Sequence, residues 1–181
     1  MRADEQSKIR RMPIQRLNHA VLFVSELKRS TEFYTNVLGF RSVHTIADQA
    51  AFLQAEGSTN DHDLGLFAMG PQAQASPAGR TSVGLYHLAW EVDTLAELRR
   101  IAGALEERGA LVGASNHGTT KALYAKDPDG LEFEVSWLVP AHLITPDTST
   151  MITERLDLDA EIKRYGDQEQ GGVGVSHRVT L

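Results

Sequence analysis

The most constraining feature of this sequence is one strand-and-helix pattern that occurs in both halves of the chain. The segment 18–27, NHAVLFVSEL, is similar to the segment 86–95, YHLAWEVDTL. Each copy is an apolar strand with a histidine near its start, followed by a residue that favours helix capping, Ser25 or Asp93. A repeat on this scale predicts two equivalent structural units.

The continuation of each copy predicts the same order of elements. A helical period follows each strand and ends at a glycine, Gly39 or Gly109. Short apolar segments separated by turns come after each helix. They span about 40–46, 50–54 and 63–69 in the first half and 111–114, 121–126 and 131–138 in the second. The sequence therefore predicts an α+β fold of two βαβββ modules.

The domain boundaries follow from where this periodicity stops. We expect a single domain over residues 13–165, with modules at about 13–70 and 81–139 and a further amphipathic helix at about 156–165. The segment 71–79, rich in Ala, Gln, Ser and Pro, is the predicted linker between the modules. The polar ends without periodicity predict a disordered leader, 1–12, and a flexible tail, 166–181.

Composition excludes several classes of site and partner. The chain has no cysteine, so any metal must be bound by histidine, carboxylate or water. Its formal net charge of −6 argues against binding to a nucleic-acid backbone. No apolar run reaches the ~20 residues needed to span a bilayer, and the first residues lack the apolar part of a secretory signal. We therefore expect a cytoplasmic protein with no nucleic-acid or membrane partner.

The alternation of polar and apolar residues along the predicted strands indicates where a metal would bind. His19 and His87 occupy equivalent positions of the two copies, and the last strand has Glu132 and Glu134 on the face opposite its apolar residues. Glu132 lies next to a turn, which favours a solvated strand end. A common cavity between the two sheet halves would bring two histidines and one carboxylate together. That donor set is typical of non-haem Fe(II), and it also suits Mn(II), Ni(II) and Zn(II).

The sequence resembles the vicinal oxygen chelate superfamily over roughly residues 13–139. The matching segments are Leu17-Asn18-His19, Phe33-Tyr34 with Leu38-Gly39-Phe40, Tyr86-His87-Leu88, Tyr124 with Asp127-Pro128-Asp129-Gly130, and Phe133-Glu134-Val135. The resemblance implies a cupped mixed sheet around a metal cavity, with His19, His87 and Glu134 as the metal ligands. It also leaves several activities open, because one fold supports many chemistries.

Within that superfamily, the second half is similar to extradiol ring-cleavage dioxygenases. Those enzymes have a Tyr ten residues ahead of the ligand Glu, which is Tyr124 here, and a nearby acid–base His, for which His117 is the nearest match. Lys121 stands where some relatives have another His. The resemblance implies an Fe(II)-dependent dioxygenase that cleaves a catechol-like vicinal diol with O2, His117 moving a proton and Tyr124 bonding a substrate oxygen. We also expect a homodimer, because two sheet halves leave edges that a second copy covers.

Two other classes of function remain open on sequence alone. A glyoxalase-like isomerase or an epimerase of the same superfamily would use a fourth protein ligand near Gly65, which has no side chain, although Asp63 shares its face. A metal-free drug-binding resistance protein would tend to lack the ligand residues that this sequence retains. Metal content separates these classes, because the enzymes require metal and the binding protein does not.

Overall fold

The computed structural model describes residues 14, 16–79, 81–149 and 152–172. The first module consists of β1 (Ala20–Val24), α1 (Leu27–Asn36), β2 (Arg41–Ile46), β3 (Ala50–Gln54) and β4 (Leu64–Ala68). The second consists of β5 (Leu88–Glu91), α2 (Leu95–Glu107), β6 (Leu111–Asn116), β7 (Thr120–Lys126) and β8 (Glu132–Leu138). Further on come a 3-10 turn (Ala141–Leu143), α3 (Pro146–Ser149), β9 (Glu154–Arg155) and α4 (Leu158–Tyr165). The predicted α+β fold of two βαβββ modules is confirmed.

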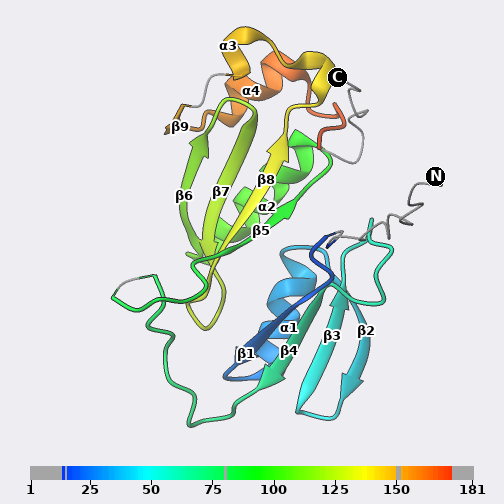
Figure 1. Cartoon of the computed structure of the whole chain (residues 1–181), viewed down its shortest axis with the longest axis vertical. Helices are drawn as coiled ribbons and strands as arrows, with labels where there is room; N and C mark the ends of the chain where they lie inside the picture. The colour runs from blue at the N-terminus through cyan, green and yellow to red at the C-terminus, as the bar shows by residue number, and fades with distance from the viewer. Residues whose placement is uncertain (1–13, 15, 80, 150–151, 173–181) are drawn as a thin grey trace, which may run out of the picture.

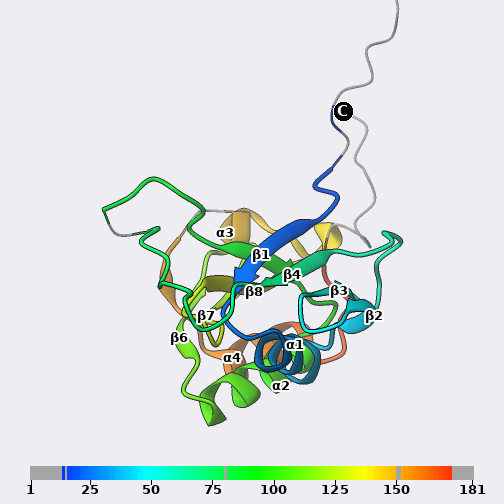
Figure 2. The same cartoon turned by 90° about the horizontal axis from the view of Figure 1, so that it is seen from below.

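Each module has its own sheet, and the two sheets have matching topologies. The first has the order β1-β4-β3-β2 and the second the order β5-β8-β7-β6-β9. The outer pairs β1–β4 and β5–β8 are parallel, and the pairings among the remaining strands are antiparallel. Helices α1 and α2 lie on the same side of the molecule, one after the other along its long axis (Figures 1 and 2). Strands β1 and β5, which follow His19 and His87, are both at the edge of their sheet.

The two helices begin one residue later than the sequence suggested. The N-cap of α2 is Thr94, whose side chain accepts a hydrogen bond from the Glu97 N–H, so Asp93 is not the capping residue. The N-cap of α1 is Glu26, which makes no side-chain cap. Ser25 is likewise not a capping residue, because its hydroxyl is used in a contact with the other module.

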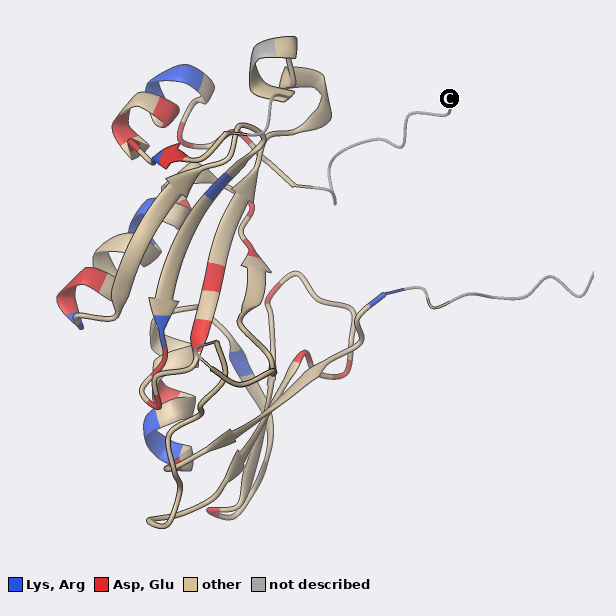
Figure 3. Ribbon diagram, turned by 60° about the vertical axis from the view of Figure 1, so that its left-hand side comes forward, with Lys and Arg blue, Asp and Glu red and all other residues tan. Residues whose placement is uncertain are grey.

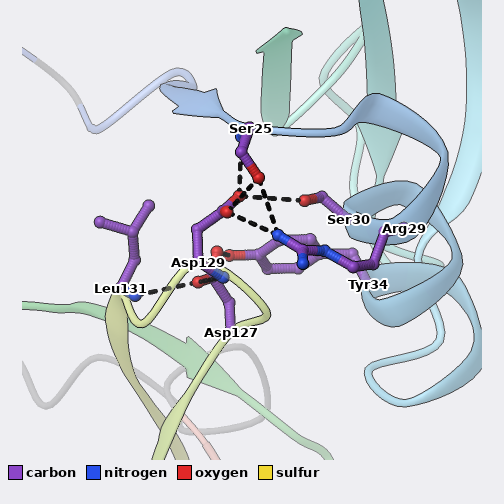
Figure 4. A network of polar contacts seen from close by, with 7 residues as sticks. All are labelled: Ser25, Arg29, Ser30, Tyr34, Asp127, Asp129 and Leu131. Carbon is purple, nitrogen blue, oxygen red and sulfur yellow. Dashed lines mark hydrogen bonds and ion pairs between the residues drawn. The ribbon is translucent and has the colours of Figure 1, made fainter. Parts of the chain in front are cut away.

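A polar network holds the two modules together (Figure 4). Asp129, in the turn between β7 and β8, accepts hydrogen bonds from the backbone N–H and the hydroxyl of Ser25, and it pairs with Arg29 at 2.7 Å. In the same turn, the Asp127 carboxylate accepts a hydrogen bond of 3.1 Å from the buried Tyr34 hydroxyl. Apolar contacts adjoin this network, such as Phe33 against Phe133 with ring centroids 5.9 Å apart. Helix α1 is therefore fixed against the start of β8 within one chain.

Replacing Tyr34 by Phe tests the energetic weight of this network. Burial raises the pKa of the Asp127 carboxyl, and the Tyr34 hydrogen bond opposes that shift. Without the hydroxyl, one buried carboxylate oxygen loses its donor, so we expect the free energy of unfolding to fall by about 1–3 kcal/mol in urea titration. Tyr165→Phe is the control, because the Tyr165 hydroxyl is buried with no hydrogen-bond partner among the described residues. Equal effects of the two variants would contradict this interpretation.

Part of the segment after the second module contacts that module. Helix α4 lies within the range where the sequence predicted a helix, and Gly171 and Gly172 of the predicted tail bond to the second module. Their N–H groups donate to the carbonyls of Asp93 and Leu138, both at 2.8 Å. A Cβ added to Gly171 would clash with the Trp137 ring, so this close approach requires glycine. The predicted leader and the rest of the predicted tail, 173–181, lie outside the described residues.

No helix in the described part of the chain is both long enough and apolar enough to cross a membrane.

Candidate metal centre

The sheet of the second module brings His87, Glu134 and Tyr124 to one face. In the parallel pair β5–β8, Ala89 lies opposite Glu134, and in the antiparallel pair β7–β8, Tyr124 lies opposite Glu134. Two residues before Ala89, on the same side of the strand, the His87 Nε2 atom lies 3.5 Å from a Glu134 carboxylate oxygen. The acidic residues of this sheet stand out among largely uncharged strands (Figure 3).

The donor atoms of His87 and Glu134 fit a divalent metal. Both side chains are mostly buried, with 27% and 13% of their surfaces exposed. The other ring nitrogen of His87, Nδ1, is buried and has no hydrogen-bond partner among the described residues. Imidazole nitrogen and carboxylate oxygen are the donors that Fe(II), Mn(II), Ni(II) and Zn(II) accept. In chemical terms, the two side chains therefore supply one nitrogen and one oxygen donor for a metal ion.

His117 and Tyr124 are in direct contact beside this pair. His117 is in the turn between β6 and β7, where its backbone N–H donates to the Thr120 carbonyl at 2.8 Å. Its Nε2 atom lies 3.0 Å from the Tyr124 hydroxyl. Burial and then the Glu134 carboxylate raise the pKa of Tyr124, so this hydroxyl keeps its proton at neutral pH. The two residues that the resemblance singled out for proton transfer therefore form one hydrogen-bonded unit.

His19 does not join this group within one chain. It precedes β1 in the first module, where its Nδ1 atom lies 2.6 Å from the Asn18 side-chain oxygen. Among the residues that the structure describes, no three His, Cys, Asp or Glu side chains are grouped closely enough to hold a metal ion. The expected cavity that encloses all three ligands is therefore not formed by a single copy, because the two modules carry separate sheets.

The first module has a second histidine beside His19. The His62 ring packs between His19, at a centroid distance of 4.6 Å, and Phe52, at 5.1 Å. His62 is in the loop before β4, the parallel neighbour of β1. The pairing of Ala20 with Leu64 explains why the loop reaches His19. This proximity follows from the parallel pairing of β1 with β4. A sequence pattern alone would not predict that pairing, because antiparallel pairs are the commoner arrangement.

The remaining candidates have structural partners. Glu132 pairs with Lys126 at 3.7 Å near the turn, as expected for a solvated strand end. Asp63 accepts hydrogen bonds from the Ala55 N–H and the Ser58 hydroxyl, so it is engaged in its own loop. Trp137, on the face of β8 opposite Glu134, is fully buried in the core. Lys121 is also buried, on the opposite side of β7 from Tyr124.

Sequence comparison finds known proteins that match most of the chain. Residues 16–135 match the Glyoxalase/Bleomycin resistance protein/Dioxygenase superfamily. A catechol-2,3-dioxygenase from Bacillus subtilis (strain 168) is 31% identical over 157 residues, which are 85% of this chain and 53% of that protein. A lactoylglutathione lyase from Escherichia coli O157:H7 is 30% identical over 135 residues, which are 66% of this chain and 90% of that protein. The chain thus spans about half the length of the Bacillus subtilis relative.

Comparison with solved structures finds the same fold. A solved glyoxalase/dioxygenase from Nostoc punctiforme superposes with a TM-score of 0.56 at 22% identity. The match covers 67% of this chain and 90% of that structure. At this identity, the likeness concerns the fold alone.

Proposed function

The chain belongs to the Glyoxalase/Bleomycin resistance protein/Dioxygenase superfamily, and from this premise we propose that it is a metal-dependent dioxygenase that cleaves the ring of a catechol-like diol with O2. The observation that carries this proposal is the hydrogen bond between His117 and Tyr124 beside Glu134. Ring cleavage requires protons to leave and return to substrate oxygens, and this pair offers a hydroxyl and an imidazole for that transfer. The 31% sequence identity between this chain and a catechol-2,3-dioxygenase supports the same reaction class.

In this proposal, His87 and Glu134 bind the metal through a ring nitrogen and a carboxylate oxygen. Fe(II) is the proposed metal, and the same donors accept Mn(II), Ni(II) or Zn(II). When bound, such an ion supplies Lewis acidity toward the vicinal hydroxyls of the substrate and, as Fe(II), the capacity to activate O2.

The chain's own groups would do the proton transfer. The Tyr124 hydroxyl faces the Glu134 side of the sheet and orients a substrate oxygen by hydrogen bonding. His117 Nε2, 3.0 Å from that hydroxyl, accepts a proton when the diol ionises and returns it later. Because both groups are partly buried, water competes less for these hydrogen bonds than it would at an open surface.

We further propose that His19 reaches this centre from a second copy of the chain. The Asp129 network fixes α1 against the second module, which keeps His19 away from His87 within one chain. The face around His19 is open and apolar, since Phe23 is 69% exposed on it. Covering such a face is favourable, and a two-fold dimer applies the same contact twice. Each dimer then has two centres, each with His19 from one copy and His87 with Glu134 from the other.

Mixing two inactive variants tests this shared centre. His19→Ala and His87→Ala chains should each lack metal and turnover. When they are refolded together, a mixed dimer has one centre with both changes and one intact centre. We expect recovery of about a quarter of the wild-type activity, since random pairing makes half of the dimers mixed. Recovery would be absent if all three ligands met within one chain, and light scattering at the monomer mass would also contradict the dimer.

The reaction itself is tested by anaerobic reconstitution with Fe(II), followed by a panel of catechols. We expect near-stoichiometric metal, O2 uptake and a yellow ring-fission product. Metal-free protein that binds an aromatic drug tightly would favour a sequestering role and would overturn the proposal.

The second candidate function is a lactoylglutathione lyase-like isomerase. The observation in its favour is that this chain covers 90% of the Escherichia coli relative with that name. A fourth ligand is then needed, and it is expected in the first module. His62, next to His19, is a nitrogen donor in that module. Conversion of a hemithioacetal without O2, together with loss of metal in His62→Ala, would support the isomerase over the dioxygenase.

A further inference from the structure

A segment beyond the matched family region folds back over the second module. Residues 152–165, here called the C-terminal strap, contain β9 and α4 (Figure 1). Strand β9 adds to the edge of β6, with Arg155 opposite Ser115. Leu156 is 7% exposed and belongs to the hydrophobic core. The strap is therefore an integral part of the second module, although the family match ends at residue 135.

The start of the strap contacts His117 directly. The Nδ1 atom of His117 lies 3.1 Å from the Ile152 carbonyl oxygen and 3.4 Å from the Thr153 hydroxyl. A carbonyl oxygen carries no proton, so Nδ1 must be the donor in that hydrogen bond. A neutral imidazole has a single N–H, and its other nitrogen is then an acceptor. With Nδ1 protonated, Nε2 accepts a hydrogen bond of 3.0 Å from the Tyr124 hydroxyl.

A buried ion pair ties the strap to the turn that carries His117. Lys121 Nζ lies 3.2 Å from the Glu161 carboxylate in α4. The same ammonium donates to the Asn116 side-chain oxygen at 2.6 Å and to the Gly118 carbonyl at 2.8 Å. Asn116 and Gly118 are the two neighbours of His117 in the sequence. Because removing one partner of a buried pair is costly, this cluster keeps the strap and the turn in one relative position.

We propose that the C-terminal strap positions His117 as the Nδ1-protonated tautomer, so that Nε2 is the nitrogen available to accept a proton at Tyr124. Ile152 acts through its backbone carbonyl and is a positioning residue. The catalytic consequence rests on the proposed function, whereas the tautomer is a property of the folded chain alone. No part of the strap needs to contact substrate for this role.

Nitrogen-15 NMR of histidine-labelled, full-length, metal-free protein measures the tautomer directly. The spectrum is recorded at a pH where the histidines are neutral. We expect His117 to carry its proton on Nδ1. His142 is the internal contrast, because its Nε2 atom faces the Glu169 carboxylate at 3.3 Å and therefore favours the Nε2-protonated form. A proton on Nε2 of His117, or a rapidly exchanging mixture, would overturn the proposal.

Variants that weaken the packing of the C-terminal strap test whether the strap determines the tautomer of His117. Leu156→Ala removes the side chain that anchors β9 in the core, and Arg155→Ala changes the adjacent exposed side chain as the matched control. In Leu156→Ala we expect His117 to shift toward a mixture of tautomers, and kcat on a catechol to fall roughly tenfold to hundredfold with KM little changed. Arg155→Ala should match the wild type in both. If Leu156→Ala fails to fold, Glu161→Gln, which removes the charge facing Lys121, replaces it.

The outcomes separate this inference from the proposed function. An Nδ1-protonated His117 that becomes mixed in the strap variants supports the positioning role, even where no catechol is cleaved. Strap variants that gain amide hydrogen exchange over 152–156 but leave the tautomer unchanged would refute it, even where ring cleavage is established.

Discussion

Replacing Glu134 by alanine is expected to strip the protein of metal and to abolish ring cleavage. Glu134 offers a carboxylate 3.5 Å from His87 and mostly screened from water. Loss of a group that merely supports a ligand lowers metal affinity by ~10–100-fold, so loss of the ligand itself should exceed that. Metal content per chain after Fe(II) reconstitution, measured by elemental analysis, is the direct readout, and His87→Ala should give the same result.

Glu132→Ala is the matched control for this prediction. It removes a carboxylate from the same face of the same strand, but Glu132 is paired with Lys126 near the turn. We expect wild-type metal content and turnover. If Glu134→Ala bound metal normally while Glu132→Ala did not, the assignment of the carboxylate ligand would be wrong. Circular dichroism of both variants verifies that the sheet is intact.

The second large effect is expected from the hydrogen-bonded pair beside the metal ligands. His117→Ala and Tyr124→Phe should retain metal but lose turnover by about 10²–10⁴-fold, which is the usual contribution of general acid–base groups. Neither residue is a proposed metal ligand, and a hydrogen bond joins His117 Nε2 to the Tyr124 hydroxyl. Rates of O2 uptake under saturating catechol, with metal content measured in parallel, provide the test.

His142→Ala is the control, because His142 is a histidine just after the second module. Its side chain is 68% exposed and paired with Glu169. It should cleave catechols at the wild-type rate. Should the His117 and Tyr124 variants do so as well, the reason for preferring ring cleavage over isomerisation would disappear, and the superfamily assignment alone would remain.

Much of the fold could be predicted because its signals are local. Alternation of apolar residues determines which face of a strand is buried, and a 3.6-residue period with a terminal glycine defines a helix. Those patterns placed the strands and helices of both modules close to their observed bounds. The helix caps were off by one residue, since the Ser25 hydroxyl bonds to Asp129, more than 100 residues away, and Thr94 rather than Asp93 accepts the capping hydrogen bond of α2.

The candidate site was predictable in part for the same reason. The pairing of Tyr124 with Glu134 follows from a short turn between two antiparallel strands, so their shared face is inherent in the sequence spacing. The pairing of β5 with β8 also repeats that of β1 with β4, which brings His87 to Glu134. The approach of His62 to His19 depended on strand order, which a hydrophobic pattern does not contain.

By itself, the sequence determined two βαβββ modules, the residue types available to a metal, and the face on which Glu134 lies. Only the tertiary structure decided how the modules meet. The Asp127–Asp129 turn, readable in the sequence as a turn alone, binds Ser25 and Tyr34 and so joins the second module to the first. The contact of Ile152 with His117 and the packing of Gly171 on Trp137 were equally hidden. The physical reason is that such contacts join distant segments through single polar atoms or close backbone approach, and neither leaves a periodic trace in the chain.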